Sequence, residues 1–180
     1  MGGLLKLALA MDWISEKFGA LASWTVILTA LISALNAFVR YGFGWTSNAA
    51  MEVQWYLFAY TFMVGAPQVL KLNEHVRVDL VYGKLKGNQP VYVDLFGLLF
   101  FLMPAMGFLC YLCVPYFLNF YNSAQGSDNA GGLSRVWWVA LSMPLGFGLV
   151  FLQGTAEVIK RLAYLQGIYQ MDTHYEKPLQ

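Results

Sequence analysis

One short segment gathers most of the residues that could bind a metal ion or carry a proton. Residues 73–84 read NEHVRVDLVYGK and hold Glu74, His75, Arg77 and Asp79. On a helix, His75 and Asp79 would stand four residues apart on one face, a spacing that suits a divalent metal, but one histidine and two carboxylates are a weak ligand set. Two other interpretations stay open. The segment is either a solvated loop or a cluster that pairs internally and fixes the return of the chain to the membrane.

Other reactive residue types do not form a second site. Cys110 and Cys113 have the CxxC spacing of redox and zinc motifs, but they lie inside an apolar run and are expected to be small hydrophobic residues. The only histidines, His75 and His174, lie outside the apolar runs, which argues against a haem held by two histidines within the bilayer. We therefore expect no catalytic residue, no metal and no cofactor, and we do not expect an enzyme.

The composition is that of a membrane protein. Of the 180 residues, 58% are hydrophobic and only 12% are charged, whereas a soluble domain carries about 25% charged residues. A soluble fold of this length could not bury so much apolar surface. The net charge of +1 shows no basic excess, so nucleic acid is not an expected partner.

Four apolar runs predict an all-α integral membrane protein with four transmembrane helices. The second run is barely long enough for a hydrocarbon core of roughly 30 Å, and the third is long enough to need a tilt or a kink, for which Pro104 and Pro115 are the obvious places. Trp137 and Trp138 open the fourth run as interfacial anchors. The predicted spans are residues 21–39, 53–70, 91–118 and 136–156.

The residues before the first span predict a separate amphipathic helix on the membrane surface. Apolar residues recur there every three or four positions, with the charged residues mostly elsewhere. The acidic residues argue against a cleaved signal peptide. The apolar positions are Leu4, Leu7, Met11, Ile14 and Phe18, and the charged ones are Lys6, Asp12, Glu16 and Lys17. The expected divisions are an interfacial arm helix over 1–20, a four-span domain over 21–161 and a tail over 162–180.

The basic residues predict the orientation of the chain. If the N-terminus is cytoplasmic, nine of the eleven Lys and Arg residues lie on the cytoplasmic side, and only Arg40 and Arg135 lie outside. This asymmetry sets the topology of membrane proteins during insertion. Both termini and residues 73–84 are therefore expected in the cytoplasm, and the Gly- and Ser-rich loop 119–134 outside.

A family resemblance emerges from motifs at fixed places among these spans. Glu52 and Trp55 open the second span, Gly65-Ala66 lies late in it, and His75-Val76-Arg77-Val78-Asp79 follows it directly. Together with the length, the four spans and the leading helix, they resemble the small membrane subunit, of DctQ type, of TRAP transporters (tripartite ATP-independent periplasmic transporters). The similarity extends over roughly residues 10–165.

The resemblance implies a function that the spacing of residues does not show. TRAP transporters are sodium-coupled secondary carriers that take up organic acids across the bacterial inner membrane. A large membrane subunit carries the sodium and substrate sites, and a soluble periplasmic substrate-binding protein delivers the cargo. The small subunit would brace the scaffold of the large one during an elevator-like cycle, with membrane lipids around it. The alternatives are a self-sufficient small four-span transporter and a membrane anchor subunit of another complex.

The resemblance also marks structural or subunit-interface candidates. Glu52 is expected to pair with a basic or amide group at the outer helix ends, or to serve as a plain acid at a helix N-terminus. Trp55 is an interfacial anchor or a partner contact. Gly65 and Ala66 would allow close helix approach.

For His75, Arg77 and Asp79 we expect a hydrogen-bonded and ionic cluster. Replacing Asp79 with Ala should then lower the yield of assembled complex more than Lys86→Ala does. Glu157 and Arg161, four residues apart, are expected to form a surface pair of little energetic weight.

Overall fold

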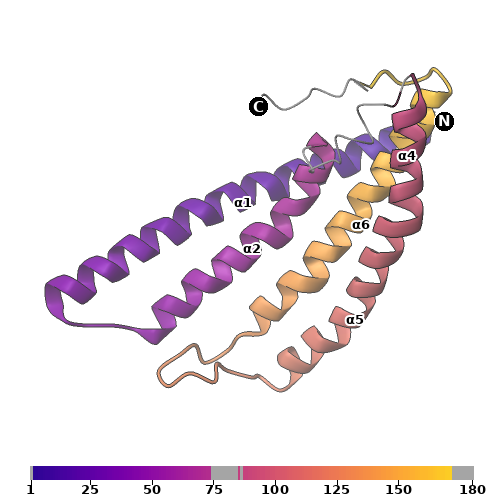
Figure 1. The fold of residues 1–180 in the computed structure, drawn as a ribbon. Coiled ribbons are helices and arrows are strands. Elements are labelled where there is room, and N and C mark those ends of the chain that lie inside the picture. Colours follow the sequence, from indigo (N-terminus) through magenta and orange to yellow (C-terminus); the bar gives the residue numbers. More distant parts are fainter. Residues whose placement is uncertain (1, 74–84, 86, 172–180) are drawn as a thin grey trace.

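The described part of the chain is entirely helical. In the computed structural model, residues 2–73, 85 and 87–171 are described, and they contain no strand. The long helices lie side by side as rods, with α1 beside α2 and α5 beside α6 (Figure 1). The helices are α1 (Gly2–Phe43), α2 (Asn48–Leu72), α4 (Gln89–Gly97), a π-helical turn η1 (Leu98–Leu102), α5 (Met103–Asn122) and α6 (Trp137–Leu165).

The first helix is continuous through the expected boundary at residue 20. It runs without a proline from Gly2 to Phe43 and is about 63 Å long at roughly 1.5 Å per residue, about twice the thickness of a hydrocarbon core. Gly44, with a φ of +67°, ends it, and Ser47 caps the start of α2. The expected arm helix and first span therefore form one helix. The placement of its first part on the membrane surface stays a prediction.

The face that α1 turns toward the other helices is small and polar. Its buried residues recur at the helical period, whereas Leu4 and Leu7 are half exposed and Trp13 is 58% exposed. This reverses the pattern of a soluble amphipathic helix, and it is favourable where lipid surrounds the helix, because lipid tails solvate leucine. Asp12, one of the charged residues of the expected amphipathic helix, is thus buried against the other helices. The buried residues of α1 are Ala8, Asp12, Ser15, Ala22 and Thr25.

Small residues allow α1 and α2 to approach closely. A Cβ atom at Gly65 would lie 3.3 Å from the Cβ of Ala22, which is already a tight contact. The hydroxyl oxygens of Thr25 and Thr61 lie 2.9 Å apart across the same interface. Helix pairs in membranes commonly associate through such small residues and interhelical hydrogen bonds.

Helix α6 is the central helix of the described structure. It contacts α1, α2, α4 and α5, and it holds more buried residues than any other described helix. A Cβ at Gly146 would lie 2.7 Å from the Cβ and 2.8 Å from the carbonyl oxygen of Met63. Glycine at position 146 is therefore what allows α2 and α6 to cross at this distance.

The third apolar run contains a π-helical turn directly before Pro104. In η1 the backbone N–H of Met103 donates to the carbonyl oxygen of Leu98, five residues back. Pro104 follows directly and has no N–H to donate, so the wider turn takes up the loss of one helical hydrogen bond. Pro115, the other expected site, lies inside the continuous helix α5.

Three segments of the described chain are long and apolar enough to cross a membrane. They are Gly2–Phe43, Gln89–Asn122 and Trp137–Leu165. Helix α2 is not among them, because polar residues lower its mean hydropathy; they include Glu52, Gln54, Gln68 and Lys71. The structure thus supports three of the four expected spans, and the span 53–70 remains a prediction.

Candidate functional site

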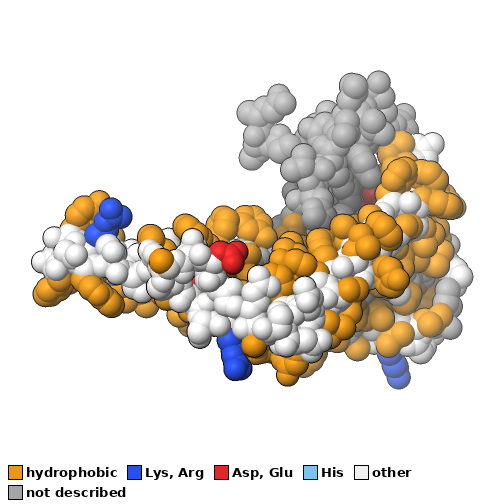
Figure 2. Space-filling view, turned by 90° about the horizontal axis from the view of Figure 1, so that it is seen from below, with side chains coloured by type: hydrophobic (Ala, Val, Ile, Leu, Met, Phe, Trp, Pro, Cys, Tyr) orange, Lys and Arg blue, Asp and Glu red, His pale blue; other side chains and the backbone are white. Residues whose placement is uncertain are grey.

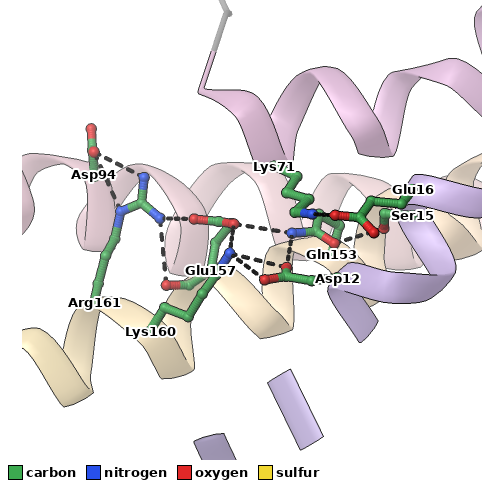
Figure 3. A network of polar contacts seen from close by, with 9 residues as sticks. All are labelled: Asp12, Ser15, Glu16, Lys71, Asp94, Gln153, Glu157, Lys160 and Arg161. Carbon is green, nitrogen blue, oxygen red and sulfur yellow. Dashed lines mark hydrogen bonds and ion pairs between the residues drawn. The ribbon is translucent and has the colours of Figure 1, made fainter. Parts of the chain in front are cut away.

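Charged side chains from four helices meet at one end of the molecule. Their core, which we call the ion cluster, is formed by Asp12, Asp94, Glu157, Lys160 and Arg161 (Figure 3). It lies where the first turns of α1 cross α6 and where α4 begins (Figures 1 and 3). The neighbouring polar side chains are Ser15, Glu16, Lys71 and Gln153.

Lys160 connects α6 to α1 within the ion cluster. Its Nζ atom lies 3.0 Å and 3.1 Å from the two carboxylate oxygens of Asp12, and 2.5 Å from Oε1 of Glu157. The Lys160 side chain is only 6% exposed. One buried ammonium group thus compensates two buried carboxylates from two helices.

Arg161 connects α6 to α4. Its Nη2 and Nε atoms donate to Oδ2 of Asp94 at 3.0 Å and 3.3 Å, and its Nη1 donates to Glu157. The expectation of a surface pair between Glu157 and Arg161 is therefore wrong, since their side chains are 4% and 5% exposed. Spacing along one helix placed the two groups side by side, but α1 and α4 cover this face of α6 and bury the pair.

An amide completes the hydrogen bonding on the α1 side. Gln153 accepts from the hydroxyl of Ser15 at 2.6 Å, and it donates to Asp12 at 2.8 Å and to Glu157 at 3.0 Å. Gln153 and Ser15 are both fully buried. A buried polar network whose members are paired holds its elements in a unique arrangement, whereas loss of one partner leaves an uncompensated group.

A partly exposed ion pair ties the second helix to this end. Lys71, in the last turn of α2, donates to Glu16 of α1. Because Glu16 is half exposed, this contact contributes less than the buried pairs do. It nevertheless brings α2 into the same polar layer as α1, α4 and α6.

A second polar group holds the loop at the opposite end, and we call it the outer clip. Glu52, in the first turns of α2, accepts hydrogen bonds from the hydroxyl of Ser127, the side-chain amide of Asn129 (2.7 Å) and the backbone N–H of Leu133 (2.8 Å). Only 1% of Glu52 is exposed. Nearby, the side-chain amide of Asn48 donates to the carbonyl of Ala130 at 2.7 Å. The loop between α5 and α6 is thereby folded onto the start of α2.

The outer clip favours the ionised form of its carboxylate. The hydroxyl of Ser127, the backbone N–H of Leu133 and the amide of Asn129 together hold the pKa of Glu52 below its ordinary value of 4.5, although burial acts in the opposite direction. Glu52 precedes the stretch expected to cross the bilayer. It is therefore a charged anchor for the loop at neutral pH.

The other sequence candidates lie apart from both groups. Trp55 is 59% exposed, and Gly65 faces α1 with partly buried Ala66 beside it. The expected cluster of His75, Arg77 and Asp79 lies outside the described residues. The structure therefore places Glu52 in a polar site and Gly65 in a helix contact, and it does not bring them together.

Sequence reasoning missed three members of the ion cluster, Asp12, Asp94 and Lys160, and the neighbouring polar side chains, among them Gln153. A signal for them exists in the acid at 157 and the bases at 160 and 161, which share one side of a helix directly after an apolar run. Charged side chains at that position must pair with opposite charges or hydrogen-bonding groups when neighbouring helices bury them. That their partners are Asp12 and Asp94 follows only from the arrangement of α1, α4 and α6.

The chemistry of both groups is that of structural anchors. Within the described residues, no three His, Cys, Asp or Glu side chains are grouped so that they could hold a metal. Cys110 and Cys113 are free thiols, and Cys110 contacts the carbonyl of Pro144 at 3.5 Å. The charged groups of the ion cluster are directed at each other, so they hold helices together rather than presenting a reactive group.

Comparison with known families identifies the chain. No curated protein and no solved structure matches it. The family model for the DctQ component of tripartite ATP-independent periplasmic transporters matches residues 29–163, about three quarters of the chain. This match includes the outer clip and all of the ion cluster except Asp12. The chain belongs to the DctQ family of TRAP transporter components.

Proposed function

We propose that the chain is the small membrane subunit that braces the large permease subunit of a sodium-coupled TRAP transporter for organic acids. The observation that carries the proposal is the family match over residues 29–163. The large subunit would hold the sodium and substrate sites, and a periplasmic binding protein would deliver the cargo. The complex would lie in the bacterial inner membrane, with both termini of this chain in the cytoplasm.

The distance between the two polar groups supports a four-span brace. Glu52 in the outer clip and Lys71 at the inner end are 19 residues apart on α2, which corresponds to about 28 Å at roughly 1.5 Å per residue. A hydrocarbon core is about 30 Å thick. Helix α2 would thus cross the bilayer with a polar anchor at each surface.

The absence of mid-membrane charge also supports a structural role. In the described helices, the stretches 18–39, 53–70, 95–122 and 136–156 contain no Asp, Glu, Lys or Arg. Ionisable side chains inside the membrane mark the paths of ions and protons through transporters. We therefore assign the transport path to the large subunit.

The outer surfaces of the helices are suited to lipid and to a membrane partner. Hydrophobic side chains are spread over the whole of the described surface seen in Figure 2, between other side chains and backbone, and charged side chains are few. Large apolar residues are exposed along α1 and along η1 and α5, among them Trp24 (64%), Phe38 (67%), Phe101 (66%) and Phe108 (61%). Within the bilayer these surfaces need no water-excluding cover and are available for packing on a scaffold.

The decisive experiment is an affinity purification of the tagged chain from gently solubilised native membranes, followed by mass spectrometry. A large multi-span permease should co-purify in stoichiometric amount. The chain alone, reconstituted in liposomes, should transport no organic acid under a sodium gradient. Recovery of a folded chain without a permease, together with transport by that chain alone, would refute the proposal in favour of a self-sufficient carrier.

The outer loop is a candidate contact for the binding protein. Glu52 accepts hydrogen bonds from Ser127, Asn129 and Leu133 of this loop, at what is the periplasmic end in the proposed orientation. Glu52→Ala should release the loop and raise the concentration of binding protein needed for half-maximal transport, with the large subunit still co-purifying. An unchanged concentration dependence would remove the loop from the docking surface.

A further inference from the structure

A cavity of about 390 Å³ lies at the outer end of the molecule, under the loop that the clip holds. Tyr56 of α2 lines it, together with side chains of α5 and α6 and of the loop. The side of the cavity formed by α5 and α6 is apolar or aromatic, and the side formed by the loop, which we call the rim, is polar. The helix side consists of Tyr116, Phe120, Val136, Val139, Ala140 and Met143, and the rim consists of Gln125, Gly126, Ser127, Asp128 and Asn129.

Aromatic residues place the cavity at headgroup depth in the proposed orientation. The rings of Tyr121 and Trp137 pack edge to face with centroids 5.7 Å apart, and those of Tyr56 and Trp138 with centroids 5.5 Å apart. Tyrosine and tryptophan concentrate at the boundary between hydrocarbon and headgroups. The polar rim then lies among the headgroups, and the helix side of the cavity lies beside the first carbons of the acyl chains.

The rim has a negative character. Among the described residues that line the cavity, Asp128 is the only carboxylate and there is no Lys or Arg. The ionised carboxylate of Glu52 lies directly behind the rim, because it accepts from both Ser127 and Asn129. A cationic group in the cavity would be attracted by both carboxylates, so a lipid that carries an ammonium is favoured over one with a net negative headgroup.

We propose that this cavity binds a phospholipid whose headgroup carries a cationic ammonium. The ammonium would lie at Asp128, and the start of one acyl chain would lie against Val139 and Met143. The tyrosine rings beside the cavity offer further favourable contact to a cation. The proposal rests on the membrane placement described under the proposed function, and it requires no contact with the large subunit.

The test is native mass spectrometry of the full chain, purified from membranes, delipidated in mild detergent and titrated with lipid. Phosphatidylethanolamine should be retained about threefold better than phosphatidylglycerol, the size expected for an exposed charge contact. Asp128→Asn should abolish this preference, and Asp128→Glu should restore it. Ala140→Phe, which fills the cavity at a position only 4% exposed, should lower retention of both lipids, whereas Ala105→Phe on the exposed side of α5 should not.

The outcomes separate this proposal from its alternatives. Equal retention of the two lipids, or a preference that survives Asp128→Asn, would overturn it. Loss of a protein partner in Asp128→Asn without any lipid preference would assign the cavity to a basic side chain of that partner. Failure to co-purify a large permease would overturn the proposed function and leave the lipid preference intact, so the two failures are distinguishable.

Discussion

Lys160 is the residue on which the ion cluster depends most. It compensates Asp12 on α1 and Glu157 on its own helix, and it lies almost entirely out of contact with solvent. Burial of charges is costly, so a buried pair adds little net stability over an apolar substitute. Removal of one partner is a different matter, because the remaining charges stay buried without compensation.

We therefore expect Lys160→Met to lower the free energy of unfolding by about 3–5 kcal/mol. The measurement is reversible unfolding in mixed micelles, monitored by tryptophan fluorescence. Lys6→Met, at an exposed position of α1, makes the same chemical change and should alter stability by less than about 0.5 kcal/mol. Similar losses in the two variants would show that the ion cluster does not hold α1 on α6.

Glu52 makes a pH-dependent contribution to the stability of the loop at the outer end. Its native pKa lies below 4.5, so the contribution is fully present above the unfolded pKa and is lost as pH falls through the lower native value. We expect hydrogen exchange at the amide of Leu133, corrected for the intrinsic rate, to accelerate as pH is lowered below about 4.5. In Glu52→Gln the corrected rate should be higher at pH 7 and nearly independent of pH. A wild-type rate that does not change on acidification would contradict the role of the carboxylate.

At the scale of helices, close crossings are set by glycine at particular positions. Gly146 and Gly148 lie two residues apart on α6 but have different neighbours. A Cβ at 146 would meet the backbone of Met63, whereas a Cβ at 148 would lie 3.7 Å from Sγ of Cys110, an ordinary contact. The same substitution at the two sites therefore separates packing from helix propensity.

We expect Gly146→Ala to destabilise the protein by about 1–3 kcal/mol, because a backbone oxygen of α2 cannot move aside without separating the helices. Gly148→Ala should be neutral or stabilising by up to about 1 kcal/mol, the propensity difference between Ala and Gly in a helix. Unfolding in mixed micelles again provides the measurement. Equal effects at both positions would mean that α2 and α6 do not cross at Gly146.

The long first helix shows how far periodicity can be used to predict an element. The run of apolar residues correctly predicted helix across 2–39, but it suggested a division at residue 20 that the backbone does not have. The apolar positions Leu4 and Leu7 are half exposed, whereas Ala8 and Asp12 are buried against the other helices. In lipid, large apolar residues need not face protein, so periodicity alone does not say which side of a helix is the core.

For the whole molecule, orientation can be tested directly. In a chain with Cys110 and Cys113 replaced by Ser, Ala130→Cys should react with a membrane-impermeant maleimide in intact spheroplasts. Gly3→Cys should react only after lysis. The physical reason is the excess of Lys and Arg on the side that holds the N-terminus. Labelling of Gly3→Cys alone in intact spheroplasts would show the opposite orientation. Labelling of both positions would contradict an odd number of spans between them and the proposed topology with it.

The division between sequence and tertiary structure is clear in this protein. Apolar run length and the positions of basic residues are properties of the chain itself, and they were sufficient to predict a helical membrane protein with three supported spans. The resemblance carried by Glu52 and Trp55, by Gly65-Ala66 and by residues 75–79 indicated the DctQ family. The partners of the charged residues could not be predicted from these properties. Whether Glu157 and Arg161 are exposed or buried depends on α1 and α4 covering α6, and Asp12 finds Lys160 across 148 positions of the chain. The cost of a buried charge is decided by what surrounds it, and only the packed helices determine those surroundings.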